Sequence, residues 1–157
     1  MNTHVNFETA KLLKEKGYSW ECSHFYSKDK YDKEFILRTG TEYDSNRDPI
    51  WDWNLNGGKS GMLLKAIPYP NDDTAIYYSA PTIAEVLMWL YEKHGIWIVS
   101  SYELNIENHQ KEWFWVGIKD GEEIAYQYKS FNSPAEAYES AITYILEDLI
   151  QGGNNVK

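Results

Sequence analysis

The stretch at residues 56–61, NGGKSG, carries the glycine, lysine and serine that phosphate-binding loops use. Such a loop follows the pattern G-x-x-x-x-G-K-[ST], in which the first glycine makes a sharp turn between a strand and a helix. If the GKS of this stretch filled the last three positions, Trp53 would stand where the first glycine belongs. Gly61 would then interrupt the helix that should follow. We therefore predict a hairpin tip at Asn56 and Gly57 instead of a phosphate site.

Cys22 and His24 could do chemistry because residues two apart in a strand point to the same face. A thiol beside an imidazole supplies two of the four ligands of a zinc site, or a nucleophile and its base. Zinc needs two further ligands, and the nucleophile needs an orienting Asn or Asp and an oxyanion hole; the sequence indicates neither. We predict a buried cysteine and a hydrogen-bonded histidine, with a functional pair as the alternative.

Other signals of catalysis or metal binding are weak throughout the sequence. The four histidines never stand four positions apart on a helix, and neither a calcium-loop motif nor an HExxH motif occurs. The 24 acidic residues are too many to single out a pair for acid–base work. We expect no catalytic residue, no cofactor and no metal, which favours a protein that is not an enzyme.

Aromatic residues are the most unusual feature of the composition, with 7 Trp, 13 Tyr and 5 Phe. Trp51 and Trp53 flank an aspartate near the predicted glycine tip, and such a pair could stack on a sugar ring or contact another protein. These two are therefore candidate ligand-binding residues. Trp113 and Trp115 stand in a stretch that is apolar on both faces, so we expect them in the core.

The net charge of −9 lies mostly in the second half of the chain. Residues 1–80 hold 10 basic and 12 acidic residues, a balance of −2, and residues 81–157 hold 5 and 12, a balance of −7. This field disfavours nucleic acid and makes a basic protein a possible partner, and a charge that serves only solubility is the alternative. Glu136, Glu139 and Glu147 lie opposite the apolar stripe of the last predicted helix, with no Lys or Arg in residues 130–156. They are candidate partner-binding residues, and a solvated helix face is the alternative.

Size and composition predict a single domain over residues 1–157. No apolar run reaches membrane-spanning length, the first residues do not follow a signal-peptide pattern, and the one cysteine excludes an internal disulfide. We therefore expect a cytoplasmic protein without a membrane segment. Residues 39–50 have the composition of a polar loop, and residues 151–157 that of a frayed tail.

The first half of the chain begins with a helix, which Asn6 would cap and Gly17 would end. Strand-forming residues at 18–27 and 34–40 then predict a hairpin. Alternating apolar residues at 51–55 and the run AIYYS at 75–79 indicate two short strands, while the rest of residues 39–78 has no clear pattern.

The second half of the chain has stronger local signals. Thr82 and Glu85 form a capping box for a helix that Gly95 ends. Three strands follow, at residues 96–104, 112–119 and 122–129, and Asp120-Gly121 is a favoured hairpin turn between the last two. The middle strand is apolar on both faces, which suits a central strand covered on each side. The helix that begins after Thr82 is expected to have an apolar stripe of Ile83, Val86, Leu87, Leu90 and Tyr91. The strand at residues 122–129 is expected to place Ile124, Tyr126 and Tyr128 on one face.

A final helix begins at Ser133 and Pro134, with Glu136 completing a second capping box, and ends at Gly152. The whole pattern predicts an α+β fold in which a mainly antiparallel sheet of about five strands, with a central three-strand meander, packs with three helices. The residues expected to be buried on the final helix are Tyr138, Ala141, Ile142, Ile145, Leu146 and Leu149.

Three blocks of the sequence carry a resemblance: NFETAKLLKEKGY from residue 6, SAPTIAEVLMWLYEKHGIWI from residue 79 and YKSFNSPAEAYESAITYILEDLI from residue 128. They are similar to a family of small proteins that phages and mobile elements of Bacteroides-type gut bacteria encode. The blocks cover roughly a third to two fifths of the chain and leave out residues 39–67. The resemblance implies a phage or mobile-element context and brings no catalytic residues, because the family has no established activity.

Together these features favour a non-enzymatic accessory protein that acts through protein–protein contacts. Its partner would be a basic host or phage protein, and mimicry of nucleic-acid charge is one form that the contact could take. Two alternatives remain: an enzyme acting on a small molecule, or a carbohydrate- or ligand-binding module, each using an aromatic-lined cleft.

Overall fold

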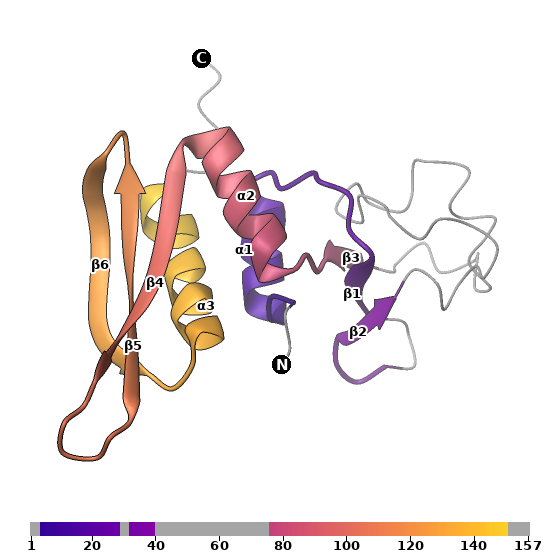
Figure 1. The fold of residues 1–157 in the computed structure, drawn as a ribbon. Helices are drawn as coiled ribbons and strands as arrows, with labels where there is room; N and C mark the ends of the chain where they lie inside the picture. Colours follow the sequence, from indigo (N-terminus) through magenta and orange to yellow (C-terminus); the bar gives the residue numbers. More distant parts are fainter. Residues whose placement is uncertain (1–3, 29–31, 40–75, 151–157) are drawn as a thin grey trace. The chain divides into compact units, whose positions relative to one another are not determined.

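The computed structural model describes residues 4–28, 32–39 and 76–150 (Figure 1). This part of the chain contains three α-helices and two three-stranded antiparallel sheets, which confirms the predicted α+β class. The chain divides into two compact units, an N-terminal unit whose described part lies within residues 4–81 and a C-terminal unit at residues 82–150. The prediction of a single domain over residues 1–157 stays a prediction.

The N-terminal unit packs helix α1 (Phe7–Glu15) against a sheet of order β2-β1-β3, with strands β1 (His24–Lys28), β2 (Ile36–Thr39) and β3 (Ile76–Ser79). As predicted, the Asn6 side chain caps α1 by accepting the N–H of Thr9 at 2.9 Å, and Gly17 follows the helix with φ 83°. The predicted hairpin is β1 and β2, although β1 begins at His24 and not near Tyr18. The strand predicted at AIYYS is β3.

The predictions for the NGGKSG stretch, for a strand at residues 51–55, for most of the polar loop at residues 39–50 and for the tail at residues 151–157 lie outside the described residues.

Helix α2 (Ile83–His94) opens the C-terminal unit, and its predicted capping box is confirmed. The Thr82 hydroxyl accepts the N–H of Glu85 at 3.2 Å, and the Glu85 carboxylate accepts the N–H of Thr82 at 2.6 Å. Gly95 ends the helix in the left-handed region with φ 68°. The buried residues are Val86, Trp89 and Leu90, so the predicted stripe was wrong about Tyr91, which is exposed, and missed Trp89.

The predicted meander is the sheet of order β4-β5-β6, formed by β4 (Ile96–Leu104), β5 (Lys111–Lys119) and β6 (Glu122–Phe131). All neighbouring strands pair antiparallel, and β5 is central as predicted. Asp120 and Gly121 join β5 to β6 with φ of 52° and 82°, the two positive values that the favoured two-residue hairpin turn requires.

Helix α3 (Pro134–Tyr144) covers one face of this meander and continues into a π-helical turn, η2 (Ile145–Leu149) (Figure 1). Ser133 caps α3 by accepting the N–H of Glu136. The wide turn is closed by the N–H of Ile150, which donates to the carbonyl oxygen of Ile145 at 3.0 Å. Because a π turn holds more residues than an α turn, the apolar stripe shifts along the chain. The buried residues are Ala137, Ala141, Ile142, Ile145, Leu146 and Ile150, whereas Tyr138 is only half-buried.

Candidate functional site

One face of the β4-β5-β6 meander packs against α3 and η2, and the opposite face presents apolar side chains outward. Strand alternation and contacts with the helix assign the residues of β5 to the two faces. The ring centre of Trp115 lies 5.6 Å from that of Tyr144, and a Cβ on Gly117 would lie 3.6 Å from Cδ1 of Ile145. We call the opposite face the open sheet face; it comprises Trp97 and Val99 of β4, Phe114, Val116 and Ile118 of β5, and Tyr126 and Tyr128 of β6.

The contacts of Gln127 fix the orientation of β6. Its side-chain oxygen accepts a hydrogen bond from the Ser140 hydroxyl of α3 at 3.0 Å, so Tyr126 and Tyr128 point to the open sheet face. The register shifts between Gly117 and Ile118, and the side chain of Ile124 lies against Gly117 on the helix-covered face. The prediction that Ile124 shares a face with the two tyrosines was therefore wrong, because a β-bulge interrupts the alternation.

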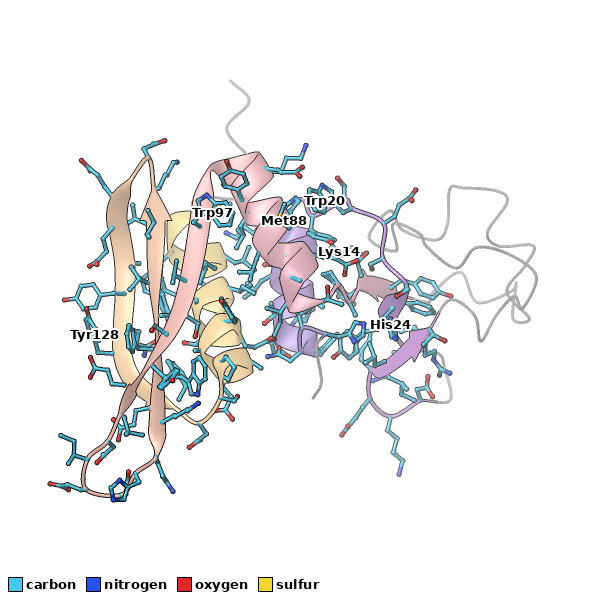
Figure 2. The ribbon with its side chains drawn as sticks, in the orientation of Figure 1. Lys14, Trp20, His24, Met88, Trp97 and Tyr128 are labelled. Atoms are coloured by element: carbon cyan, nitrogen blue, oxygen red, sulfur yellow. The ribbon has the colours of Figure 1, made fainter. Side chains whose placement is uncertain are left out.

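The open sheet face is exposed although most of its residues are apolar. Tyr126 and Tyr128 are 58% and 64% exposed, and Val99 is 47% exposed. The ring centres of Tyr126 and Tyr128 lie 5.0 Å apart, and that of Phe114 lies 5.4 Å from Tyr128. Figure 2 shows Tyr128 projecting from β6 on the side away from α3. Phe114, Val116 and Ile118 of β5 are half-buried, and within the described residues a helix covers only the other face of this strand, contrary to the predicted cover on each side. Exposed apolar clusters of this kind mark binding surfaces.

Trp97 lies at the edge of the open sheet face, at the start of β4. Its ring centre is 4.3 Å from that of Tyr91 in α2, and Figure 2 shows it beside that helix. Because Tyr91 and Trp97 both remain partly exposed, the two rings extend the apolar surface past the edge of the sheet.

Carboxylates stand at both ends of the open sheet face. Glu103 of β4 and Glu112 of β5 are directly opposite each other in the register, two positions beyond Ser101 and Phe114 along the strands. Glu123 of β6 pairs with Ile118 at the other end. Alternation places Lys111 and Lys119 on the opposite face. Among the side chains of the open sheet face that the structure describes, none is basic.

The three glutamates predicted to bind a partner differ in their surroundings. The Glu136 carboxylate accepts the N–H of Asn132 at 3.0 Å and not that of the cap residue Ser133, so the predicted second capping box was wrong in its return bond. Glu139 is half-buried in α3. Glu147 is exposed in η2, where the π turn changes the direction of successive side chains. The three glutamates therefore differ in exposure and contacts, and their role in binding a partner stays a prediction.

The structure confirms a buried cysteine and a hydrogen-bonded histidine in the N-terminal unit. The Cys22 thiol donates to the backbone oxygen of His24 at 3.0 Å, while the imidazole Nδ1 of His24 bonds to the Ser23 hydroxyl at 2.8 Å. The His4 ring centre lies 3.8 Å from that of His24. In the part of the chain that the structure describes, no group of three or more His, Cys, Asp or Glu could hold a metal ion.

The predicted tryptophan sites have three outcomes. Trp115 is buried in the core as predicted. Trp113 is half-buried, and its ring centre lies 5.0 Å from that of Tyr102. Trp51 and Trp53, the candidate ligand-binding pair, lie outside the described residues.

His94 ends α2, and its ring centre lies 4.9 Å from that of Trp89. Burial is the main cause that lowers the pKa of His94, and the positive charge of Lys119 lowers it further. The ring Nε2 is buried and has no hydrogen-bond partner among the described residues. A neutral imidazole therefore suits this half-buried position.

Sequence reasoning missed the open sheet face as a site. The available signal was the apolar character of β5 on both faces, since a strand covered by a helix on one side only should alternate. In the described residues no helix is long and apolar enough to span a membrane. Comparison of the chain with protein-family models, curated proteins and solved structures found no match.

Proposed function

We propose that this chain is a non-enzymatic accessory protein of the cytoplasm that binds a basic protein through the open sheet face of its C-terminal unit. The observation that carries the proposal is the composition of that face, where exposed aromatic and aliphatic side chains lie between carboxylates. Apolar contact supplies affinity, and the carboxylates select a partner of opposite charge.

The charge of the whole unit supports a basic partner. Residues 82–151 contain 4 basic and 12 acidic residues, a balance of −8. A surface in this field attracts cationic proteins at long range and repels phosphate backbones, so nucleic acid is the less favoured partner. The resemblance to phage and mobile-element proteins suggests a basic host or phage protein as the source of the contact.

The experiment is a pull-down with the tagged protein at low and high salt, in which retained proteins are identified by mass spectrometry. Two variants are compared with the wild type: Val99→Ser with Tyr128→Ser on the open sheet face, and Ile106→Ser as the matched control. Ile106 is 86% exposed and lies in the loop between β4 and β5, so it tests exposed apolar surface outside the face.

We expect the wild type and Ile106→Ser to retain a basic protein at low salt. The double variant should not retain this protein, and high salt should release it from the wild type. If every retained protein binds the double variant as well as the wild type, the open sheet face is not the binding surface and the proposal fails.

A carbohydrate-binding module is the second candidate, because the exposed rings of Tyr126 and Tyr128 could stack on a sugar. Titration of the wild type with soluble oligosaccharides, followed through Trp and Tyr fluorescence, tests it. A saturable change that is lost in Tyr128→Ser would favour this candidate over a protein partner.

A further inference from the structure

We infer that the segment bound by the open sheet face is one amphipathic helix of the partner, with an apolar stripe along its middle and an Arg or Lys near each end. The inference rests on the proposed function, because it specifies the form of a basic protein partner. Three independent features of the face carry it: its width, its length and the placement of its charges.

The width of the meander fits a single helix. The sheet has three strands, β4, β5 and β6, and neighbouring strands lie about 4.8 Å apart, so the outer two are about 10 Å apart. A helix with its side chains is about 10–12 Å across. The covered face of the same sheet shows this arrangement, since the single helix α3 contacts all three strands. A second helix on the open sheet face would complete a three-layer packing.

The length of the face sets the spacing of the cations on that helix. Glu112 and Ile118 lie six residues apart on β5, and Glu123 is the register partner of Ile118. At about 3.3 Å per residue the two acidic ends are therefore about 20 Å apart. Four turns of α-helix advance about 22 Å and return to the same side of the helix. Cations about 14 residues apart would thus meet both acidic ends.

The charges favour Arg at the end near Glu103 and Glu112. These two carboxylates oppose each other across the β4–β5 pair, and a guanidinium can donate two parallel hydrogen bonds to carboxylate oxygens through its planar fork. The ring of Phe114, next to Glu112 on the same face, and that of Tyr128 beside it offer stacking contacts to the same group. A second copy of this chain is a poor occupant, because its own open sheet face would bring the same three carboxylates against these.

The experiment measures fluorescence anisotropy with three labelled peptides of 18 residues. The first has a Leu and Ile stripe at helical spacing and Arg at positions 2 and 16. The second carries the same stripe with Glu at those two positions. The third has the composition of the first, but its apolar residues are spread around the helix. The protein is used as wild type, as Val99→Ser with Tyr128→Ser, as Glu103→Gln with Glu123→Gln, and as the control Glu107→Gln, whose side chain is exposed in the loop after β4.

We expect the wild type and Glu107→Gln to bind the first peptide at least tenfold more tightly than the second and the third, and each open-face variant to lose at least tenfold of that affinity. Circular dichroism spectra confirm that the variants fold. If the first and third peptides bind equally tightly, and both bind more weakly to Glu103→Gln with Glu123→Gln, the helix inference is overturned. The proposed function would still stand in that case. Binding to none of the peptides would also overturn the inference, while the pull-down would still decide the proposed function.

Self-association is the remaining outcome. If sedimentation shows a dimer that Val99→Ser with Tyr128→Ser converts to a monomer, the face is occupied by a second copy and the inference is wrong.

Discussion

The opposed carboxylates of Glu103 and Glu112 make a prediction about stability that needs no knowledge of a partner. They are direct register partners on β4 and β5, so both negative charges lie on the open sheet face. Like charges directly opposite each other in an antiparallel pair are destabilising. Replacing one of them with a cation should therefore stabilise the fold, and Glu103→Lys is the better choice because the Glu112 side chain also accepts a hydrogen bond from Asn105.

The register sets the size of the effect. Opposed Cβ atoms lie about 4.5–5.5 Å apart, so the charged groups can be taken as about 6 Å apart. Two unit charges at that distance in water interact by about 0.7 kcal/mol. Removing a repulsion and gaining an equal attraction gives about 1.4 kcal/mol, which screening at 0.1 M salt reduces to about 0.8 kcal/mol. In 1 M salt, where the Debye length is about 3 Å, the same change should fall to about 0.2 kcal/mol.

The assay is urea unfolding of the wild type, Glu103→Lys and the control Glu107→Lys at both salt concentrations. Glu107 is exposed in the loop after β4 and has no register partner, so its replacement changes the net charge equally without touching the pair. We expect Glu103→Lys to exceed Glu107→Lys in free energy of unfolding by about 0.5–1 kcal/mol at 0.1 M salt. If the two variants agree at both salt concentrations, the carboxylates do not interact across the strands and the reasoning is refuted.

Other predictions concern the framework of the two sheets and helices. Gly117→Ala should raise the free energy of unfolding by about 0.4–1 kcal/mol, because an added Cβ would make ordinary contacts at 3.6 Å. Gly121→Ala should lower the free energy of unfolding by about 1–2 kcal/mol, because Gly121 has φ 82°. Thermal unfolding compares the two variants. Thr82→Ala should lower it by about 1 kcal/mol through loss of the α2 cap, with Thr82→Ser retaining most of the stability. Burial lowers the pKa of His94 in the folded protein below its ordinary value of 6.5, so the unfolded chain binds this proton more tightly. The contribution of His94 to the free energy of unfolding should be full above pH 6.5 and should fall as the pH decreases from there through the pKa of the folded state. His94→Gln should remove this contribution to the pH dependence of stability between pH 5 and 7.

Sequence patterns predicted those elements whose signals are local. The capping residues Asn6, Thr82 and Ser133 begin the three helices, and the Asp120-Gly121 turn joins two strands, as expected. Each of these signals depends on hydrogen bonds or backbone angles within a few residues, so tertiary packing does not need to be known.

The incorrect predictions arose where the chain departs from a regular period. The β-bulge before Ala125 moves Ile124 to the face opposite Tyr126, and the π turn η2 brings Ile150 into the buried set. One extra residue in a strand moves the side chains that follow to the opposite face, and one extra residue in a helical turn rotates the side chains that follow around the helix axis. The amino-acid composition does not reveal where such an extra residue lies. Exposure of the open sheet face could not be predicted for another reason. An apolar strand face has the same sequence whether its cover comes from the same chain or from a partner.

Two features that are unfavourable for the isolated chain meet on the open sheet face. The first is exposed apolar area at Val99, Tyr126 and Tyr128, and the second is the like-charged pair of Glu103 and Glu112. They depend on different physical terms, hydration and Coulomb repulsion, so neither one entails the other. A basic amphipathic helix would relieve both at once. Glu103→Lys therefore distinguishes a binding surface from a poorly packed one. If the open sheet face is a binding surface, this variant is more stable to unfolding and binds a basic partner more weakly. If the face is only poorly packed, the variant is more stable but shows no change in partner binding.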